Sequence, residues 1–165
     1  MRLNALTICV ASLFLAAAGI AAADDLAPQL EGKWKLVKAE RNGKLLPKEQ
    51  FDNDIVLTCS KAEKEGIKIV VKKADKVVSE GTAKHAKSDE VVKGDHYDMT
   101  YTKGTDSDGK DLKGKTLHGL LHVDGDTLMA CWGEKHPKDF KPAKDSNLTC
   151  RTYERIKEKK KEEKK

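Results

Sequence analysis

The sequence is poor in aromatic residues and prolines, and it lacks the short motifs of common catalytic and cofactor sites. Phe, Trp and Tyr make up 5% of the 165 residues, and there are 4 prolines. No glycine-rich phosphate loop, nucleophile elbow or His-Glu-x-x-His pair occurs. No Cys-x-x-Cys pair occurs, so a redox motif or a structural zinc knuckle has no support. We therefore expect no enzyme and no cofactor; a hydrolase or isomerase based on a histidine has no motif behind it.

One long apolar run lies at the start of the chain. It extends from Leu6 to Ala23, follows the positive charge of Arg2 and ends in small residues. No basic stop-transfer cluster follows it, so it predicts a cleavable secretory signal rather than a retained membrane helix. Removing 23 of the 165 residues leaves 142, which suits one domain with a modest core. The predicted organisation is a signal peptide at 1–23, a short linker at 24–29, a domain at 30–157 and a charged, disordered tail at 158–165.

Charge is dense but of mixed sign. The chain has 32 Lys and Arg against 27 Asp and Glu, a net charge of +5 that is spread along the sequence. Such a mild, dispersed excess is typical of a solvated surface and not of a nucleic-acid footprint. We expect a secreted or periplasmic monomer that binds no nucleic acid and has no integral membrane span after signal removal.

The cysteines that follow the signal are odd in number: Cys59, Cys131 and Cys150. One disulfide and one free thiol are the natural arrangement in an oxidising compartment. We expect Cys131–Cys150, which closes a loop of about 20 residues and stabilises by roughly 3 kcal/mol in the chain-entropy model. Cys59–Cys150 is the alternative pairing.

Apolar residues recur with a period of two along most of the chain. The clearest case is Tyr97, Met99 and Tyr101, which alternate with His96, Asp98 and Thr100. This alternation indicates strands with one buried and one wet face. The eight predicted strands are Lys33–Arg41, Asp54–Cys59, Ile67–Lys72, Lys76–Lys84, His96–Tyr101, Lys115–Val123, Thr127–Trp132 and Leu148–Ile156.

The predicted connections are short, which bears on how the strands are arranged. Asn42-Gly43 and Asp124-Gly125 are typical of tight hairpin turns, and Pro47–Asp52 predicts a helical turn after the first strand. Sequential strands joined in this way favour an all-β, closed up-and-down barrel, because closure removes exposed sheet edges. An immunoglobulin-like sandwich would need longer cross-connections and a Cys–Trp–Cys order that is absent here.

The opening strand carries a short motif, Gly-Lys-Trp-Lys-Leu, at Gly32–Leu36. It resembles the Gly-x-Trp signature that begins lipocalin barrels. The resemblance implies that Trp34 packs across the closed end of the barrel against an arginine of the last strand. Arg151 and Arg155 are the two candidates for that structural role. A cation over an indole face contributes on the order of 1 kcal/mol.

Two further motifs extend this resemblance over most of residues 30–157. Together with the start, a Gly-Lys-Thr-x-x-Gly run and a Gly-Asp-Thr-Leu-x-x-Cys run are similar to a family of secreted lipocalin-like domains of unknown function that is abundant in planctomycete bacteria. The resemblance implies a lipocalin-like barrel and export, and it implies no chemistry. The matching residues are Gly114, Lys115, Thr116, Gly119, Gly125, Asp126, Thr127, Leu128 and Cys131.

The expected function is non-catalytic binding of a small, partly apolar ligand at the barrel mouth. An eight-stranded barrel is just wide enough to be packed solid or to hold one small guest. The scarcity of aromatic residues favours a barrel interior filled by side chains, with a shallow mouth. The alternative function is a solid protein-interaction or cell-envelope-associated module that binds no small ligand. The residues expected to line the ligand site are Tyr97, Met99, Tyr101, Leu120, Leu128 and Trp132.

No metal site is expected. His118 and His122 form a His-x-x-x-His pair, which on a helix would share one face and chelate an ion. On a strand, four residues span about 13 Å, which is too far for one ion. Because this segment reads as a strand, these histidines are expected to lie on the barrel surface or at its mouth.

Overall fold

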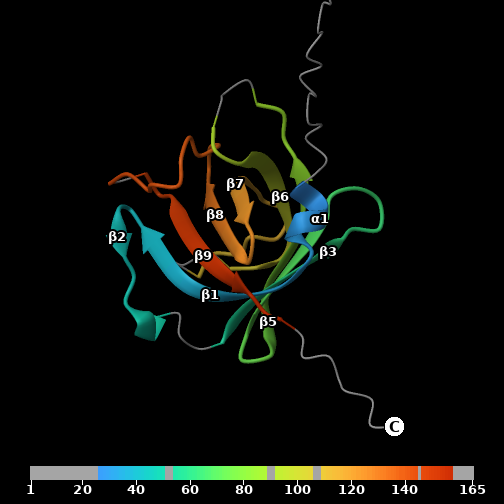
Figure 1. The fold of residues 1–165 in the computed structure, drawn as a ribbon, viewed down its shortest axis with the longest axis horizontal. Helices are drawn as coiled ribbons and strands as arrows, with labels where there is room; N and C mark the ends of the chain where they lie inside the picture. The colour runs from blue at the N-terminus through green and yellow to red at the C-terminus, as the bar shows by residue number, and fades with distance from the viewer. Residues whose placement is uncertain (1–25, 51–53, 89–91, 106–108, 145, 158–165) are drawn as a thin grey trace, which may run out of the picture.

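The protein forms a closed antiparallel β-barrel, which confirms the predicted fold class. The computed structural model describes residues 26–50, 54–88, 92–105, 109–144 and 146–157 (Figure 1). The predicted signal peptide and tail lie outside these residues. Neighbouring strands follow chain order from β3 to β9, and β1 pairs with both β3 and β9 to close the sheet.

All eight predicted strands are present within the described ranges, together with a two-residue strand, β2, that pairs only with β1. A short helix, α1, precedes them, and a 3-10 turn, η1, occupies part of the predicted helical turn. The bounds are α1 Leu26–Leu30, β1 Gly32–Arg41, β2 Lys44–Leu45, η1 Lys48–Gln50, β3 Ile55–Lys61, β4 Ile67–Lys73, β5 Lys76–His85, β6 Asp95–Gly104, β7 Thr116–Asp124, β8 Thr127–Gly133 and β9 Thr149–Arg155.

Two predicted hairpin turns form, one at the expected residues and one shifted by a single residue. Asn42 and Gly43 have φ angles of 51° and 73°, the left-handed conformation that a tight turn between β1 and β2 requires. The second turn is one residue later than expected: Asp124 pairs with Thr127, so Gly125 and the residue after it form the turn. Gly125 takes a φ of 57°, as the first turn position of a Gly-x hairpin demands.

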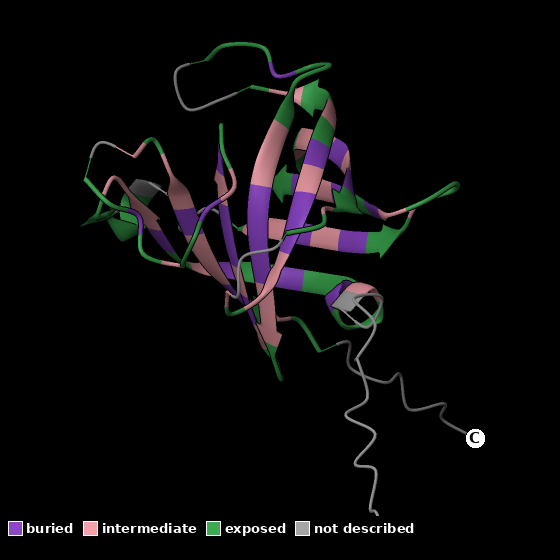
Figure 2. Ribbon diagram, turned by 90° about the horizontal axis from the view of Figure 1, so that it is seen from above, coloured by how far each residue is buried: buried purple, intermediate pink, exposed green. Residues whose placement is uncertain are grey.

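The inner faces of the strands form one continuous core, visible in Figure 2 as buried bands that alternate with less buried ones. On β6, Tyr97 and Met99 point into this core, while Asp98 between them is only half-buried. Alternate residues of β6 therefore face the core and the outside of the barrel, as the sequence predicts.

Trp34 closes one end of the barrel. Its side chain is fully buried, and its Nε1–H donates a hydrogen bond of 2.9 Å to the backbone oxygen of Leu30. The guanidinium of Arg155 lies 4.0 Å above the indole ring and donates to the backbone oxygens of Gln29 and Glu31. Arg155 is therefore the cation that stacks on Trp34, and Arg151 lies elsewhere.

Helix α1 occupies residues that the sequence predicts to be a short linker. It packs against β3 and β7, and Leu30 at its end is fully buried in the core. Because Arg155 donates to one backbone oxygen within the helix and to one just after it, the helix and the last strand are joined across this end of the barrel. Residues 26–29 are thus part of the folded domain.

The predicted disulfide Cys131–Cys150 is present and joins β8 to β9, where the two residues are direct cross-strand partners. Cys59 is the free cysteine and lies buried in the core. Burial raises the pKa of its thiol to about 12, against a weaker opposing effect of Arg155.

Candidate functional site

A cavity of about 710 Å³ lies at the end of the barrel opposite Trp34. Trp34 lies near the start of β1, whereas Arg41 at the end of β1 lines the cavity. The wall also includes the ends of β4, β6 and β8 and the beginnings of β3, β5, β7 and β9, as expected for one mouth of an up-and-down barrel. Among its lining residues are Ile55, Val71, Tyr101, Leu112, Lys115, Trp132, Thr149 and Arg151.

Trp132 owes its position in the cavity wall to a glycine on the neighbouring strand. Gly119 pairs directly with Trp132, and a Cβ at position 119 would collide with three carbons of the indole ring. The ring therefore lies flat over the Gly119 backbone, half-buried between the core and the cavity. Gly119 is one of the residues that match the lipocalin-like motif, and close packing on Trp132 gives its physical role here.

Arg151 places a permanent positive charge in this wall. Its cross-strand partners Ala39 and Ala130 both belong to the inner core, so its side chain points into the barrel. Tyr153, which forms a side-chain hydrogen bond with the guanidinium, raises the pKa of Arg151 against the opposing effect of burial. Among the described residues, no carboxylate is paired with it.

Tyr101 is a second aromatic neighbour of that cation, after Tyr153. Burial raises the pKa of its hydroxyl, and the charge of Arg151 opposes this rise. The hydroxyl is therefore protonated at neutral pH and can donate a hydrogen bond. The cavity combines a guanidinium, a phenol, an indole and aliphatic side chains, which suits a ligand with an apolar body and an anionic or strongly polar end.

The structure divides the six predicted lining residues into three groups. Tyr101 and Trp132 line the cavity. Tyr97, Met99 and Leu128 lie in the packed core and not in the cavity wall. Side chains pack together in the part of the barrel toward Trp34, while the opposite end encloses the cavity.

The prediction for Leu120 is wrong. It is fully buried, but its cross-strand partners are His96 and Cys131, and the adjacent Leu121 is the residue that joins the inner core. Leu120 therefore faces outward, where the β8–β9 loop (residues 134–144 and 146–148) covers the wall. His96, on the same face, donates a hydrogen bond of 2.9 Å from its Nε2–H to the backbone oxygen of Pro137 in that loop.

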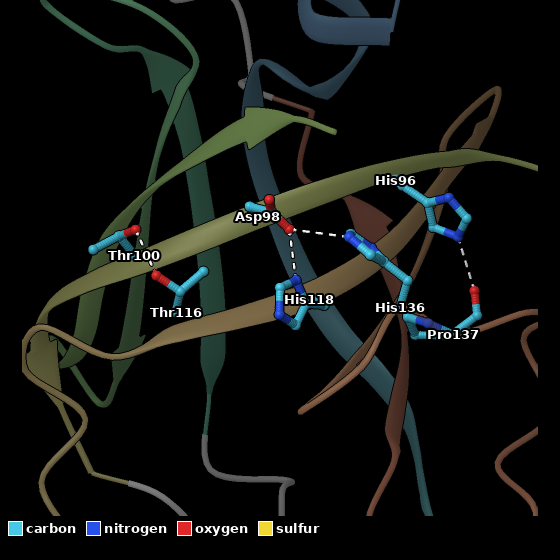
Figure 3. Close-up of polar contacts among 7 residues, drawn as sticks. All are labelled: His96, Asp98, Thr100, Thr116, His118, His136 and Pro137. Carbon is cyan, nitrogen blue, oxygen red and sulfur yellow. Dashed lines mark hydrogen bonds and ion pairs between the residues drawn. The ribbon is translucent and has the colours of Figure 1, made fainter. Parts of the chain in front are cut away.

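A second group of polar side chains lies on this outer face. Asp98 on β6 and His118 on β7 are direct cross-strand partners, and their Oδ1 and Nδ1 atoms are 2.7 Å apart. His136 of the β8–β9 loop brings its Nε2 to 3.2 Å from the same oxygen. Figure 3 shows both imidazole rings turned toward Asp98 from different elements. We call Asp98, His118 and His136 the outer histidine cluster.

The electrostatics of the cluster favour neutral imidazole at His136. Partial burial lowers its pKa, the charge of Asp98 opposes this, and the neighbouring histidines add to the lowering. His136 also packs its ring against those of His118 and His96, with centroids 4.6 Å and 4.8 Å apart.

His118 and His122 both lie on strand β7, as the sequence predicts. The partners of His118 are Asp98 and His136, which the sequence analysis did not connect to it. The alternation of Asp98 with Tyr97 and Met99 did indicate that Asp98 faces outward. Only the β6–β7 register and the path of the β8–β9 loop complete the cluster.

No family model matches the sequence, and no curated protein matches it. Among solved structures, the chain is similar to one described as the REP1-NXSQ fatty acid transporter, with 11% identity and a TM-score of 0.43, covering 80% of this chain and 99% of that one. It is also similar to the wild-type fluorescent protein UnaG, with 11% identity and a TM-score of 0.40 over 79% and 99% of the two chains. At these values the likenesses carry no conclusion about a ligand of this chain.

Proposed function

We propose that the protein is an exported, non-catalytic carrier that binds one small, partly apolar ligand in the cavity opposite Trp34. The observation that carries this proposal is the cavity itself. Its volume of about 710 Å³ lies within the range of about 300–1,000 Å³ that is typical of small-molecule sites. A barrel that only presents its surface to a partner has no need of an internal space of this size.

The chemistry of the wall supports a ligand with an acidic group. Arg151 is charged and faces the barrel interior, and the Tyr101 hydroxyl beside it remains a proton donor at neutral pH. A carboxylate, sulfonate or phosphate would accept hydrogen bonds from both, while Trp132 and Ile55 contact an apolar body. Charge-assisted hydrogen bonds of this kind contribute about 1.5–3 kcal/mol each.

The proposal includes export. The apolar run after Arg2 has the form of a signal peptide. The Cys131–Cys150 disulfide supports an oxidising compartment such as the periplasm or the cell exterior, because disulfides rarely persist in the cytosol. Within the described residues, no helix is long and apolar enough to cross a membrane.

The alternative of a solid interaction module receives less support. It requires a filled interior and a contiguous apolar patch on the surface. The exposed large apolar side chains of the described residues are instead dispersed over β2, β5 and the residue after β9: Leu45, Val78 and Ile156.

Two matched fluorescent probes test the proposal. Anilinonaphthalene sulfonate and N-phenylnaphthylamine share an aromatic body, but only the first carries an anionic group. We expect both to bind one site, with energy transfer from the tryptophans, and the sulfonate to bind more tightly. Arg151→Met should weaken the sulfonate by about tenfold or more and leave the uncharged probe nearly unchanged, because only the charged contact is lost.

Lys84→Met is the control, since Lys84 is an exposed cation on β5 whose partner is Glu65 and which lies outside the cavity wall. It should leave both affinities unchanged. Circular dichroism establishes that each variant is folded. Failure of wild-type protein to bind either probe, or equal binding of the sulfonate by wild type and Arg151→Met, would contradict the proposed site.

A further inference from the structure

We propose that Asp98, His118 and His136 form a binding site for a first-row transition-metal ion such as Zn²⁺, on the outer wall of the barrel. The inference is independent of the ligand cavity. It rests on the position of three donor atoms, one from each side chain, which all lie within 4.8 Å of one another.

The donor set matches the preferences of these ions. Imidazole nitrogens with one carboxylate are common ligands of Zn²⁺ and of other first-row metals, whereas Ca²⁺ and Mg²⁺ select sites built from oxygen. Three protein ligands leave a fourth position for water or another molecule, as in open zinc sites. The two rings contact the Asp98 carboxylate directly.

Two of the three donor–donor distances are close to those of a loaded site. Donor atoms about 2.0–2.1 Å from a tetrahedral ion lie about 3.3 Å from one another. The Asp98 oxygen is already 3.2 Å from His136 Nε2 and 2.7 Å from His118 Nδ1. An ion would replace the proton between Asp98 and His118, and side-chain rotation would have to bring together the two imidazole nitrogens, which lie within 4.8 Å of each other.

The scaffold holds the three ligands on rigid and semi-rigid elements. Asp98 and His118 face each other across the β6–β7 ladder, so their spacing is set by the sheet. His136 is held near them because the next residue, Pro137, bonds through its backbone oxygen to the buried His96. His96 uses Nε2 for that contact, so it supports the position of the loop and is not counted among the ligands.

A bound ion would join the β8–β9 loop to the barrel wall. The same connection contributes Glu134 and Asn147 to the wall of the cavity on the inner side. Metal binding would thus hold the loop that borders the cavity mouth, and we expect the ion to raise the thermal stability of the protein.

The experiment is a zinc titration of the exported chain, purified without a histidine tag and freed of metal by a chelator. Competition against a chromogenic zinc indicator should give one site per chain. His118→Ala and His136→Ala should each weaken zinc binding by about tenfold or more, because each removes one of three protein ligands. The site is refuted if wild-type protein binds zinc no more tightly than the double variant.

His122→Ala is the matched control. It lies on β7 on the same outer face as His118, and its ring contacts Phe140 rather than the cluster. We expect unchanged zinc affinity; a loss as large as that of His118→Ala would show that binding is not local to the cluster. Should either cluster variant fail to fold, anomalous scattering from a zinc-soaked wild-type crystal decides: a peak among the three side chains supports the site, and its absence overturns it.

Discussion

Replacement of Trp34 by alanine is the most informative test of how the barrel is closed. The indole is fully buried, hydrogen-bonded to the Leu30 backbone and covered by the Arg155 guanidinium. Trp34→Ala removes all three interactions at once. It also leaves a cavity in the buried core to which Trp34 belongs.

The expected loss is large for a domain of this size. Truncating a buried tryptophan to alanine costs about 3–5 kcal/mol, and loss of the cation over the ring adds about 1 kcal/mol. For a chain of this length, that corresponds to a fall in Tm of roughly 10 °C or more. Urea unfolding followed by far-ultraviolet circular dichroism measures the change without relying on tryptophan emission.

Trp132→Ala is the comparison, because this second tryptophan is half-buried at the cavity and lacks a stacked arginine. We expect it to cost clearly less than Trp34→Ala. If Trp34→Ala lowers the free energy of unfolding by under about 1 kcal/mol, or if Trp132→Ala costs more, then Trp34 is not the residue that closes the barrel.

Three further changes test neighbouring features. Gly119→Ala should destabilise by about 1–3 kcal/mol and shift the emission of Trp132, since the new methyl group displaces the ring; an unaltered spectrum and stability would contradict the packing. Replacing both Cys131 and Cys150 by alanine should cost about 3 kcal/mol in urea unfolding, and no loss would argue against the disulfide. Cys59 should resist a thiol reagent at pH 8 until the protein unfolds. The pKa of the Cys59 thiol is about 12 in the folded protein, above its ordinary value of 9.0. Below about pH 9 the thiol is protonated in both the folded and the unfolded chain, so it causes no change in stability with pH. As the pH rises from 9 toward 12, the thiol ionises only in the unfolded chain, so the free energy of unfolding should fall.

The strands were predictable because their signal is local. Alternation along β6 identified Tyr97 and Met99 as inward-facing, and glycine with asparagine or aspartate marked two of the turns. The pairing of Cys131 with Cys150 followed from cysteine count and spacing. Each of these inferences depends on residues that are close in sequence, where period and turn chemistry act directly.

Leu120 shows where the same reasoning fails. Alternation separates the two faces of a strand only when one face is wet, and β7 carries apolar residues on both because the β8–β9 loop covers its outer side. Leu120 and Leu121 are both buried, and no local pattern distinguishes them. The facing follows from the cross-strand partners, which the sequence of one strand does not contain.

Long-range contacts account for the remaining differences. The outer histidine cluster depends on the β6–β7 register and on a loop that returns to the wall with His136. Helix α1 is too short to give a periodic signal, and it is held by contacts of Arg155 that span more than 120 residues of sequence. The cavity, too, results from the arrangement of nearly all the strands at one end.

Native mass spectrometry of the protein purified from its own host tests the proposed carrier function most directly. We predict a fraction of wild-type molecules that retains one small organic molecule under gentle ionisation, and a smaller fraction for Arg151→Met purified in the same way. Wild-type protein found solely at the mass of the unliganded chain would contradict the account.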